Sequence, residues 1–282
     1  MNYEIPEPRP QGEALLERKI AVVTGGGAKD GIGIGAATAI RLAGAGAHVV
    51  VVNRSAAAGE VTRSLIEDSG GSCDVLAADT SSAKDCEAVV GTVADRHGRI
   101  DILVNNAAIS DLGKGHLRDM AEEGWDAVMD VNLKGMMLMS RSALRTMSGG
   151  ASIINLSSIA ALRHSANVPL AYATSKGAIM TLTSALASQL GASGIRVNCV
   201  VPGGVWTPIA WRAFAAVMSP AEVEAARERR RTSVPLQNEG TAWDVADAIL
   251  FFASDQSRWI TGQSLVVDGG HCINDPSYTY LK

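Results

Sequence analysis

The chain has 282 residues, of which 47% are hydrophobic and 19% charged, so it can form a large core and is not a disordered protein. Its formal net charge of −4 gives no reason to expect a nucleic-acid partner. The N-terminus lacks the apolar segment of a secretory signal, and no stretch is long and apolar enough to span a bilayer. We therefore expect a soluble cytoplasmic protein without a membrane partner.

Residues 1–18 contain closely spaced prolines and predict an extended arm outside the core. After this arm, short β-branched segments alternate with longer Ala-rich segments. The expected strands are residues 20–24, 49–53, 73–77, 102–104, 152–156, 196–201 and 264–267. The expected helices lie near residues 33–46, 56–70, 82–97, 121–147, 172–192 and 241–254.

Several expected strands are apolar at consecutive positions, as strands buried on both faces are. Their alternation with helices favours a doubly wound parallel sheet in a three-layer α/β fold. The chain has no internal repeat or linker, so we expect a single domain over residues 19–270 and a tail at 271–282. Residues 205–235 include Trp206 and an arginine-rich run, and predict either a solvated helix or a lid over a substrate.

A glycine-rich run, T-G-G-G-A-K-D-G-I-G-I-G over residues 24–35, follows the first expected strand and opens a helix. Glycine allows the backbone to approach a pyrophosphate, whose charge is stabilised by the exposed N–H groups of a helix start. A bare glycine-rich turn is often a plain loop, but this one has the strand and helix that a dinucleotide fold requires. The run therefore predicts a dinucleotide-binding turn.

The second expected strand ends at a position where an acidic residue would bind the ribose 2′-hydroxyl of NAD. Asn53 and Arg54 stand there instead, and an arginine suits the 2′-phosphate of NADP. Lys29, within the glycine-rich run, could add a second positive charge. We expect NADP(H) to be preferred. NAD(H) is the alternative if Arg54 is only a solvated loop residue.

Tyr172 stands four residues before Lys176, so the two side chains share one face of an expected helix. A neighbouring cation favours the phenolate and lowers the tyrosine pKa from its usual value near 10. Such a pair can move a proton on or off a substrate oxygen near neutral pH. By itself the spacing is also common on ordinary surface helices.

With the glycine-rich run, Asn53-Arg54 and the Tyr172/Lys176 pair in register, the chain resembles a short-chain dehydrogenase/reductase over about residues 19–270. The resemblance implies a Rossmann-type domain that binds NAD(P) and transfers a hydride between the nicotinamide and a carbonyl or alcohol. The cofactor-binding positions that it implies are Gly25, Gly33, Ile34, Gly35, Asn53, Arg54, Asp79, Thr80, Asn106, Ala107, Tyr172, Lys176, Pro202, Gly203, Val205 and Thr207.

The resemblance also implies four catalytic residues. Tyr172 is the acid/base, and Lys176 lowers its pKa and binds the nicotinamide ribose. Ser158, in I-N-L-S-S-I-A-A, hydrogen-bonds the substrate oxygen, and Asn132, in D-V-N-L-K-G, holds a proton-relay water through a helix distortion. Ser158 precedes Tyr172 by one residue more than is common in the family, which leaves Ser157 as an alternative. The glycine-rich run is longer than the family's motif, which leaves residues 31–33 as an alternative register to 33–35.

The segments expected to border the substrate, residues 110–117, 159–170 and 206–218, are largely apolar. They suggest a mid-sized, fairly apolar ketone or alcohol, and the arginine-rich run leaves an anionic group open. The resemblance suggests a homotetramer or dimer, packed through the helices near 121–147 and 172–192.

Two other interpretations are weighed against this enzyme. A sugar-nucleotide epimerase or dehydratase shares the Tyr/Lys pair but has a different glycine motif and a longer C-terminal region. A non-catalytic NADP-sensing or scaffold protein would not need the four catalytic residues together. The cysteines and histidines lack ligand-like spacing, so no metal centre is expected.

Overall fold

The computed structural model describes residues 15–110, 117–164 and 168–274, apart from the side chains of residues 119, 209 and 213. These residues form a seven-stranded sheet in the order β3-β2-β1-β4-β5-β6-β7, with every neighbouring pair parallel. The strands are β1 (Ile20–Thr24), β2 (His48–Asn53), β3 (Ser72–Ala77), β4 (Ile102–Asn105), β5 (Ser152–Leu156), β6 (Arg196–Pro202) and β7 (Ser264–Val267). The expected strands are thus confirmed to within a residue at each end.

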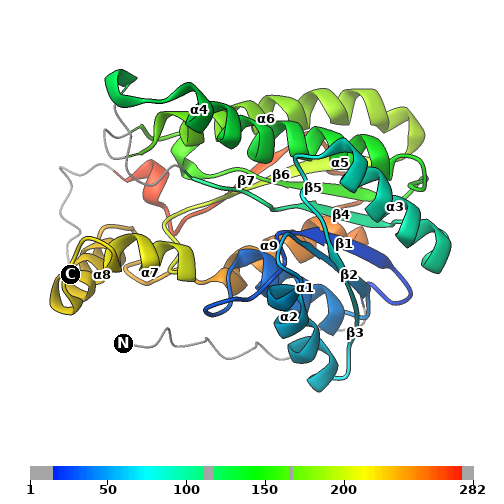
Figure 1. Ribbon diagram of the computed structural model, residues 1–282, viewed down its shortest axis with the longest axis horizontal. Coiled ribbons are helices and arrows are strands. Elements are labelled where there is room, and N and C mark those ends of the chain that lie inside the picture. The colour runs from blue at the N-terminus through cyan, green and yellow to red at the C-terminus, as the bar shows by residue number, and fades with distance from the viewer. Residues whose placement is uncertain (1–14, 111–116, 165–167, 275–282) are drawn as a thin grey trace.

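Helices cover both faces of the sheet (Figure 1). They are α1 (Ile34–Gly44), α2 (Ala56–Asp68), α3 (Ala83–His97), α4 (Glu122–Met129), α5 (Gly135–Ala143), α6 (Leu170–Leu190), α7 (Pro208–Ala215), α8 (Pro220–Thr232) and α9 (Ala242–Ala253). The expected three-layer, doubly wound α/β fold is confirmed.

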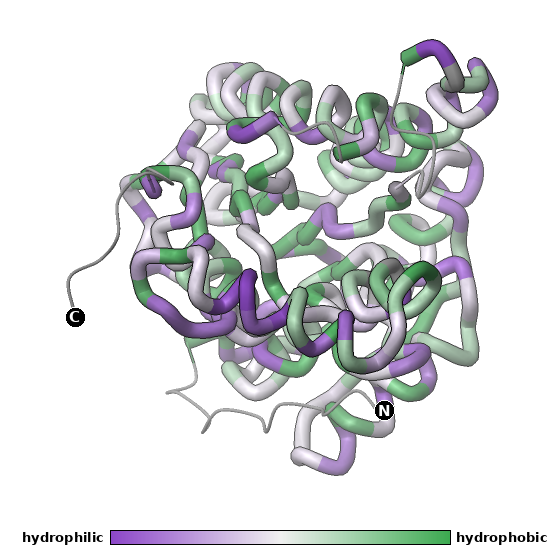
Figure 2. The backbone as a smooth tube through the Cα atoms, turned by 90° about the vertical axis from the view of Figure 1, so that its left-hand side faces the viewer, coloured by the Kyte–Doolittle hydropathy of each residue, from purple (hydrophilic) through white to green (hydrophobic). Residues whose placement is uncertain are grey.

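Two hydrophobic clusters hold the layers together. One joins α1 and α9 to the sheet, and the other joins α3 and α5 to the opposite face. The strands between them contain runs of consecutive apolar residues, such as residues 49–52 of β2 and 102–104 of β4, and Figure 2 shows green tubes in the middle of the molecule. Burial on both faces explains why these strands do not alternate between polar and apolar residues.

The expected helix over residues 121–147 is interrupted. Its middle is a single π-helical turn, Asp130–Lys134, between α4 and α5, and α5 ends at Ala143. The π-turn contains Asn132, which is fully buried. Such turns inside α-helices often occur at functional sites.

The segment before β1 also differs from the expectation. Leu16, within the expected arm, is 1% exposed, and its N–H donates to the carbonyl of Ala45. The core therefore begins before Lys19, and residues 1–14 of the expected arm lie outside the described residues. Across the described part of the chain, no helix is both long enough and apolar enough to span a bilayer.

Strand order reverses direction between β1 and β4, which leaves a crevice at the carboxyl ends of these two strands. The loops that follow β1, β4, β5 and β6 all begin at this edge of the sheet, because every strand runs in the same direction. Open parallel sheets bind their ligands at such a point. The fold thus brings the expected glycine-rich turn and the expected catalytic residues to one place.

Candidate active site

The glycine-rich turn packs closely against the loop after β4. Gly25 has φ +65, and a Cβ there would lie 2.8 Å from the Cα of Ala107. A Cβ on Gly35 would overlap the carbonyl oxygen of Gly25. Both positions therefore need glycine to let the backbone segments approach.

Helix α1 begins at Ile34 with Gly33 as its N-cap, and this end has no side-chain cap and no acidic residue in its first turn. Nothing lies within 4 Å of a Cβ built on Gly33. The first N–H groups of α1 are therefore available to an anion such as a pyrophosphate. This geometry favours the register Gly33-Ile34-Gly35 over the alternative at residues 31–33.

Thr24 and Asn106 fix the turn to the loop after β4. The Asn106 Nδ2 donates to the carbonyls of Thr24 and Gly25, at 2.9 and 3.0 Å. The Thr24 hydroxyl oxygen accepts from the N–H groups of Asn106 and Ala107, at 3.0 and 3.1 Å. Thr24 was not among the expected site residues, although its place at the end of β1 beside the glycines could have indicated it.

A smaller hollow lies beside the ends of β2 and β3. It is lined by residues expected to bind the adenosine half of the cofactor: Asn53, Arg54, Asp79, Thr80 and Ala107. The Asp79 carboxylate accepts hydrogen bonds from the Ser81 hydroxyl and N–H, which hold the pKa of this carboxyl below its usual range. Arg54 is exposed at the rim of the hollow.

Tyr172, near the start of α6, faces a cavity of about 590 Å³ together with Ser158, Lys176 and the glycine-rich turn. Burial raises the pKa of Tyr172, and a hydrogen bond with Ser158 acts in the opposite direction. The sequence-based expectation that the pKa of this tyrosine is lowered is therefore wrong for the protein alone. The physical reason is that loss of water around the phenol outweighs the polar contact.

Lys176 is 2% exposed, and its Nζ lies 5.6 Å from the centre of the Tyr172 ring. The same Nζ donates to the carbonyl of Leu156 at 2.7 Å. Burial lowers the pKa of this lysine to about 8. Its ammonium form is thus less stable than that of an ordinary lysine, and its charge does not offset the burial of the tyrosine.

Ser157 and Ser158 take different roles. The Ser157 hydroxyl donates to the carbonyl of Lys176 at 2.7 Å, and this side chain is 4% exposed. Ser158 is only half-buried, accepts from the N–H of Ala160 and contacts Tyr172. The geometry therefore favours Ser158 as the residue that meets a substrate oxygen.

Asn132 reaches the loop after β4 from the π-turn. Its Oδ1 accepts from the N–H of Ile109 at 2.8 Å, and its Nδ2 donates to the carbonyl of Ile109 at 2.9 Å and to the Ser175 hydroxyl at 3.1 Å. Ser175 in turn donates to the carbonyl of Tyr172 at 2.8 Å. Ser175 was not expected to take part, because a serine within a helix gives no signal in the sequence.

The segment after β6 closes the cavity on the side of α7 and α8. Thr207 caps α7 by accepting from the N–H of Ala210 at 3.3 Å. Arg212 of α7 forms an ion pair of 2.6 Å with Asp30 of the glycine-rich turn, which joins this segment to the opposite wall. The expected cofactor residues on this wall are Pro202, Gly203, Val205 and Thr207, and all of them line the cavity.

Comparisons with known proteins identify the family of this chain. A family model described as enoyl-(acyl carrier protein) reductase matches residues 27–272. Dehydrogenase/reductase SDR family member 4 of Oryctolagus cuniculus is 35% identical over 257 residues, which cover 90% of this chain and 94% of that protein. The chain belongs to the short-chain dehydrogenase/reductase family.

Other members of the family are similarly close. The uncharacterized oxidoreductase YhxC of Bacillus subtilis is 35% identical, over 94% of this chain and 89% of that protein. The crystal structure of a short-chain dehydrogenase/reductase from Burkholderia xenovorans has a TM-score of 0.86 at 34% identity, over 92% of this chain and 98% of that one. The protein is therefore an oxidoreductase of this family that uses a nicotinamide cofactor.

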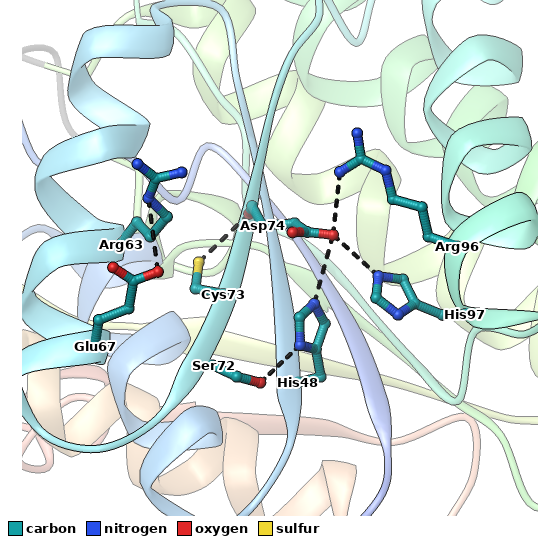
Figure 3. Close-up of polar contacts among 8 residues, drawn as sticks. All are labelled: His48, Arg63, Glu67, Ser72, Cys73, Asp74, Arg96 and His97. Atoms are coloured by element: carbon teal, nitrogen blue, oxygen red, sulfur yellow. Dashed lines mark hydrogen bonds and ion pairs between the residues drawn. The ribbon is translucent and has the colours of Figure 1, made fainter.

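A second polar cluster lies away from the cavity, where β2, β3 and the end of α3 meet (Figure 3). The Asp74 carboxylate is 3.6 Å from the His48 Nε2, 3.0 Å from the His97 Nε2 and 3.2 Å from the Arg96 guanidinium. The spacing of these histidines in the sequence did not indicate that they meet. Since Arg96 shares the carboxylate oxygen with both imidazoles, we interpret the cluster as an ion-paired network at the edge of the sheet.

Proposed function

We propose that this protein interconverts a ketone or aldehyde and the corresponding alcohol by hydride transfer, with NADP(H) as its preferred cofactor. One observation carries the proposal: Tyr172, Ser158 and Lys176 face the same cavity as the uncapped start of α1. The turn can hold a pyrophosphate while the phenol reaches a substrate oxygen.

The bound nicotinamide would supply or accept the hydride. Gly33, Ile34 and Gly35 would hold its pyrophosphate at the start of α1, and Val205 and Thr207 would contact the nicotinamide end. These residues fit such a group because the glycines leave the backbone accessible and the helix start carries no competing side-chain cap.

The protein's own residues would move the proton. In reduction, Tyr172 donates its hydroxyl proton to the substrate oxygen, and in oxidation it removes that proton. The Ser158 hydroxyl orients the same oxygen through a fixed hydrogen bond. Lys176 holds the nicotinamide ribose, and its charge stabilises the phenolate after proton transfer. Asn132 fixes the loop after β4 against α6 and so keeps Tyr172 in position.

The preference for NADP(H) rests on the end of β2. Arg54 is exposed at the rim of the hollow lined by Asn53 and Asp79, and no acidic residue stands at the position that would bind a free 2′-hydroxyl. An arginine there can pair with a 2′-phosphate.

We also propose that the protein is cytoplasmic and forms homo-oligomers. Apolar side chains are exposed at the β7 edge of the sheet, where Leu265 and Val266 are 38% and 37% exposed and the nearby Trp259 is 97% exposed. A second copy could bury them. Light scattering on the purified protein measures the assembly directly, and a monomer at all concentrations would refute this part of the proposal.

The test of the activity is an absorbance screen at the nicotinamide band, with both cofactors against a varied panel of ketones, aldehydes, alcohols and an enoyl thioester. We expect turnover of carbonyl compounds by the native protein and none by Tyr172→Phe, which should still bind the cofactor. Cofactor binding without any turnover across the panel would favour a sensing or scaffold protein. Turnover of the enoyl thioester alone would replace carbonyl chemistry by C=C reduction.

A further inference from the structure

Two arginines of α8 face the same aromatic ring but differ in their partners. Arg227 and Arg230 lie 5.3 and 5.9 Å from the Trp206 ring. The Arg227 guanidinium binds both oxygens of Glu239, at distances of 2.6 to 3.0 Å. Its charge is therefore matched within the protein.

Arg230 has no such partner among the described residues. No carboxylate there lies within ion-pair distance of its guanidinium, and no described group accepts a hydrogen bond from it. The carboxylate whose charge it feels is Glu239, which Arg227 already binds. Burial, followed by the charges of Arg163 and Arg230, lowers the pKa of the neighbouring His271, while the Asp268 carboxylate acts in the opposite direction.

The guanidinium of Arg230 is nevertheless held by contacts with the protein and does not extend into solvent. It lies 5.4 Å from the Phe214 ring, which stacks on Trp206 with ring centres 6.0 Å apart. The space it occupies exists because residue 204 is glycine: a Cβ there would lie 2.8 Å from the Arg230 Nη2. A half-buried cation held by two aromatic rings is costly unless an anion joins it.

Arg230 lines the cavity that also contains Tyr172 and Ser158. We propose that it binds an anionic group carried by the substrate, so that the natural substrate is a carbonyl or hydroxy compound ending in an oxyanion. The planar guanidinium suits a carboxylate, sulfonate or phosphate. The ring of Phe214, which also lines the cavity, contacts the apolar chain between this group and the reacting carbon.

This inference rests on the proposed function and refines its substrate. The probes are the linear oxo-acids 4-oxopentanoate, 7-oxooctanoate and 10-oxoundecanoate, each paired with its methyl ester, which has the same ketone but no charge. Sulfonate and phosphate analogues of the best chain length distinguish the oxyanions. The measured quantity is the ratio of kcat/KM for the acid to kcat/KM for the ester.

For the native protein we expect a ratio of roughly ten to a hundred at one chain length, as a charge-assisted hydrogen bond provides. Arg230→Gln should bring the ratio close to one, and Arg230→Lys should keep part of it. Gly204→Ala should also lower the ratio, because its Cβ displaces the guanidinium without removing the charge. The matched control is Arg229→Gln on the exposed face of the same helix, which should keep the native ratio.

A native ratio near one, or a ratio that survives Arg230→Gln, would overturn the inference. So would a loss of NADP(H) affinity in Arg230→Gln as large as the loss for the acid, since the anion would then be a cofactor phosphate. Calorimetric binding of the same acid and ester to the protein with NADP⁺ separates this inference from the activity. Preferential binding of the acid that Arg230→Gln removes, without turnover of any probe, would refute the activity and retain the anion site.

Discussion

Asn132 of the π-turn and Ser175 of α6 are joined by a hydrogen bond of 3.1 Å between two fully buried side chains. The same asparagine satisfies both the N–H and the carbonyl of Ile109. The helix that carries Tyr172 is thereby fixed to the loop after β4. A small change in this contact would move the tyrosine relative to the cavity.

We expect Asn132→Ala to lower the free energy of unfolding by about 2–4 kcal/mol, because it removes the side-chain partner of the N–H and carbonyl of Ile109 and the donor to the Ser175 hydroxyl. Ser175→Ala removes two hydrogen bonds where Asn132→Ala removes three, and it leaves the Asn132 Nδ2 bonded to Ile109, so it should cost about 1 kcal/mol. Urea unfolding measures both. Equal stability of the two variants would show that the Ile109 contacts contribute little.

Ser157 and Ser158, the two serines that follow β5, give a matched pair of variants. Ser158→Ala should lower kcat by roughly a hundredfold to a thousandfold, because it removes a donor placed at the substrate oxygen. Ser157→Ala should mainly lower stability, by about 1 kcal/mol, since its hydroxyl donates to the carbonyl of Lys176. Steady-state kinetics together with thermal unfolding separates the effects. The reverse pattern would assign the catalytic role to Ser157.

Lys176 is a site where activity and stability should conflict. Its pKa falls from 10.5 to about 8, which corresponds to roughly 3 kcal/mol against the charged form. Below pH 8 the buried ammonium lowers the free energy of unfolding by this full amount. Between pH 8 and 10.5 this destabilisation disappears, because the lysine of the folded protein loses its proton. Lys176→Met should therefore be inactive, yet more stable than the native protein at pH 7 by about 1–3 kcal/mol.

The pH dependence provides the control for Lys176→Met. Between pH 8 and 10, native stability should rise relative to that of the variant, so that the difference between them narrows. Denaturant unfolding at several pH values measures this. A constant difference would mean that the hydrogen bond to Leu156, and not the charge, dominates.

Arg54 should decide between the two cofactors. Arg54→Gln removes the cation at the rim of the adenosine hollow, so we expect KM for NADPH to rise about tenfold to thirtyfold with little change for NADH. Arg63→Gln, on the exposed face of α2, is the control and should leave both values unchanged. A native protein that already prefers NADH would refute the proposed cofactor choice.

The sequence predicted the strands well because strands buried on both faces contain continuous apolar runs. Its motifs follow those strands, which brings Ser158, Tyr172 and the glycine-rich turn to one cavity. The pattern of residues 121–147 gave no sign of the π-turn, since one extra residue in a turn barely changes a helical pattern; only the family resemblance implied a helix distortion at Asn132. The sequence also did not predict the hydrogen bond between Asn132 and Ser175, or the direction of the Tyr172 pKa shift. Both depend on which other segments cover α6.

The cluster of His48 and His97 shows the same limit. These residues lie far apart in the chain, and they meet because β2 pairs with β3 in the register His48 to Ser72, with α3 returning to the same edge. Their ring centres are 4.3 Å apart. A contact that depends on strand register cannot be predicted from the residues on either side of each histidine in the sequence.

His48 should make the protein less stable in mild acid. Burial, followed by the nearby His97, lowers its pKa below 6.5, although Asp74 acts in the opposite direction. The Nε2 of His48 lies 3.6 Å from the Asp74 carboxylate, and its Nδ1 lies 2.6 Å from the Ser72 hydroxyl oxygen. Above pH 6.5 the imidazole is neutral in both the folded and the unfolded chain, so it adds no pH dependence there.

As the pH falls through 6.5, the unfolded chain takes up a proton that the folded protein resists, and stability declines. His271 contributes in the same direction, since burial and then Arg163 lower its pKa as well. We therefore expect the free energy of unfolding of the native protein to fall between pH 7 and 5.5. His48→Gln should make this fall shallower, while the part of it due to His271 persists. Urea unfolding across this range measures both. An unchanged slope in His48→Gln would show that the Asp74 carboxylate already compensates the proton on His48.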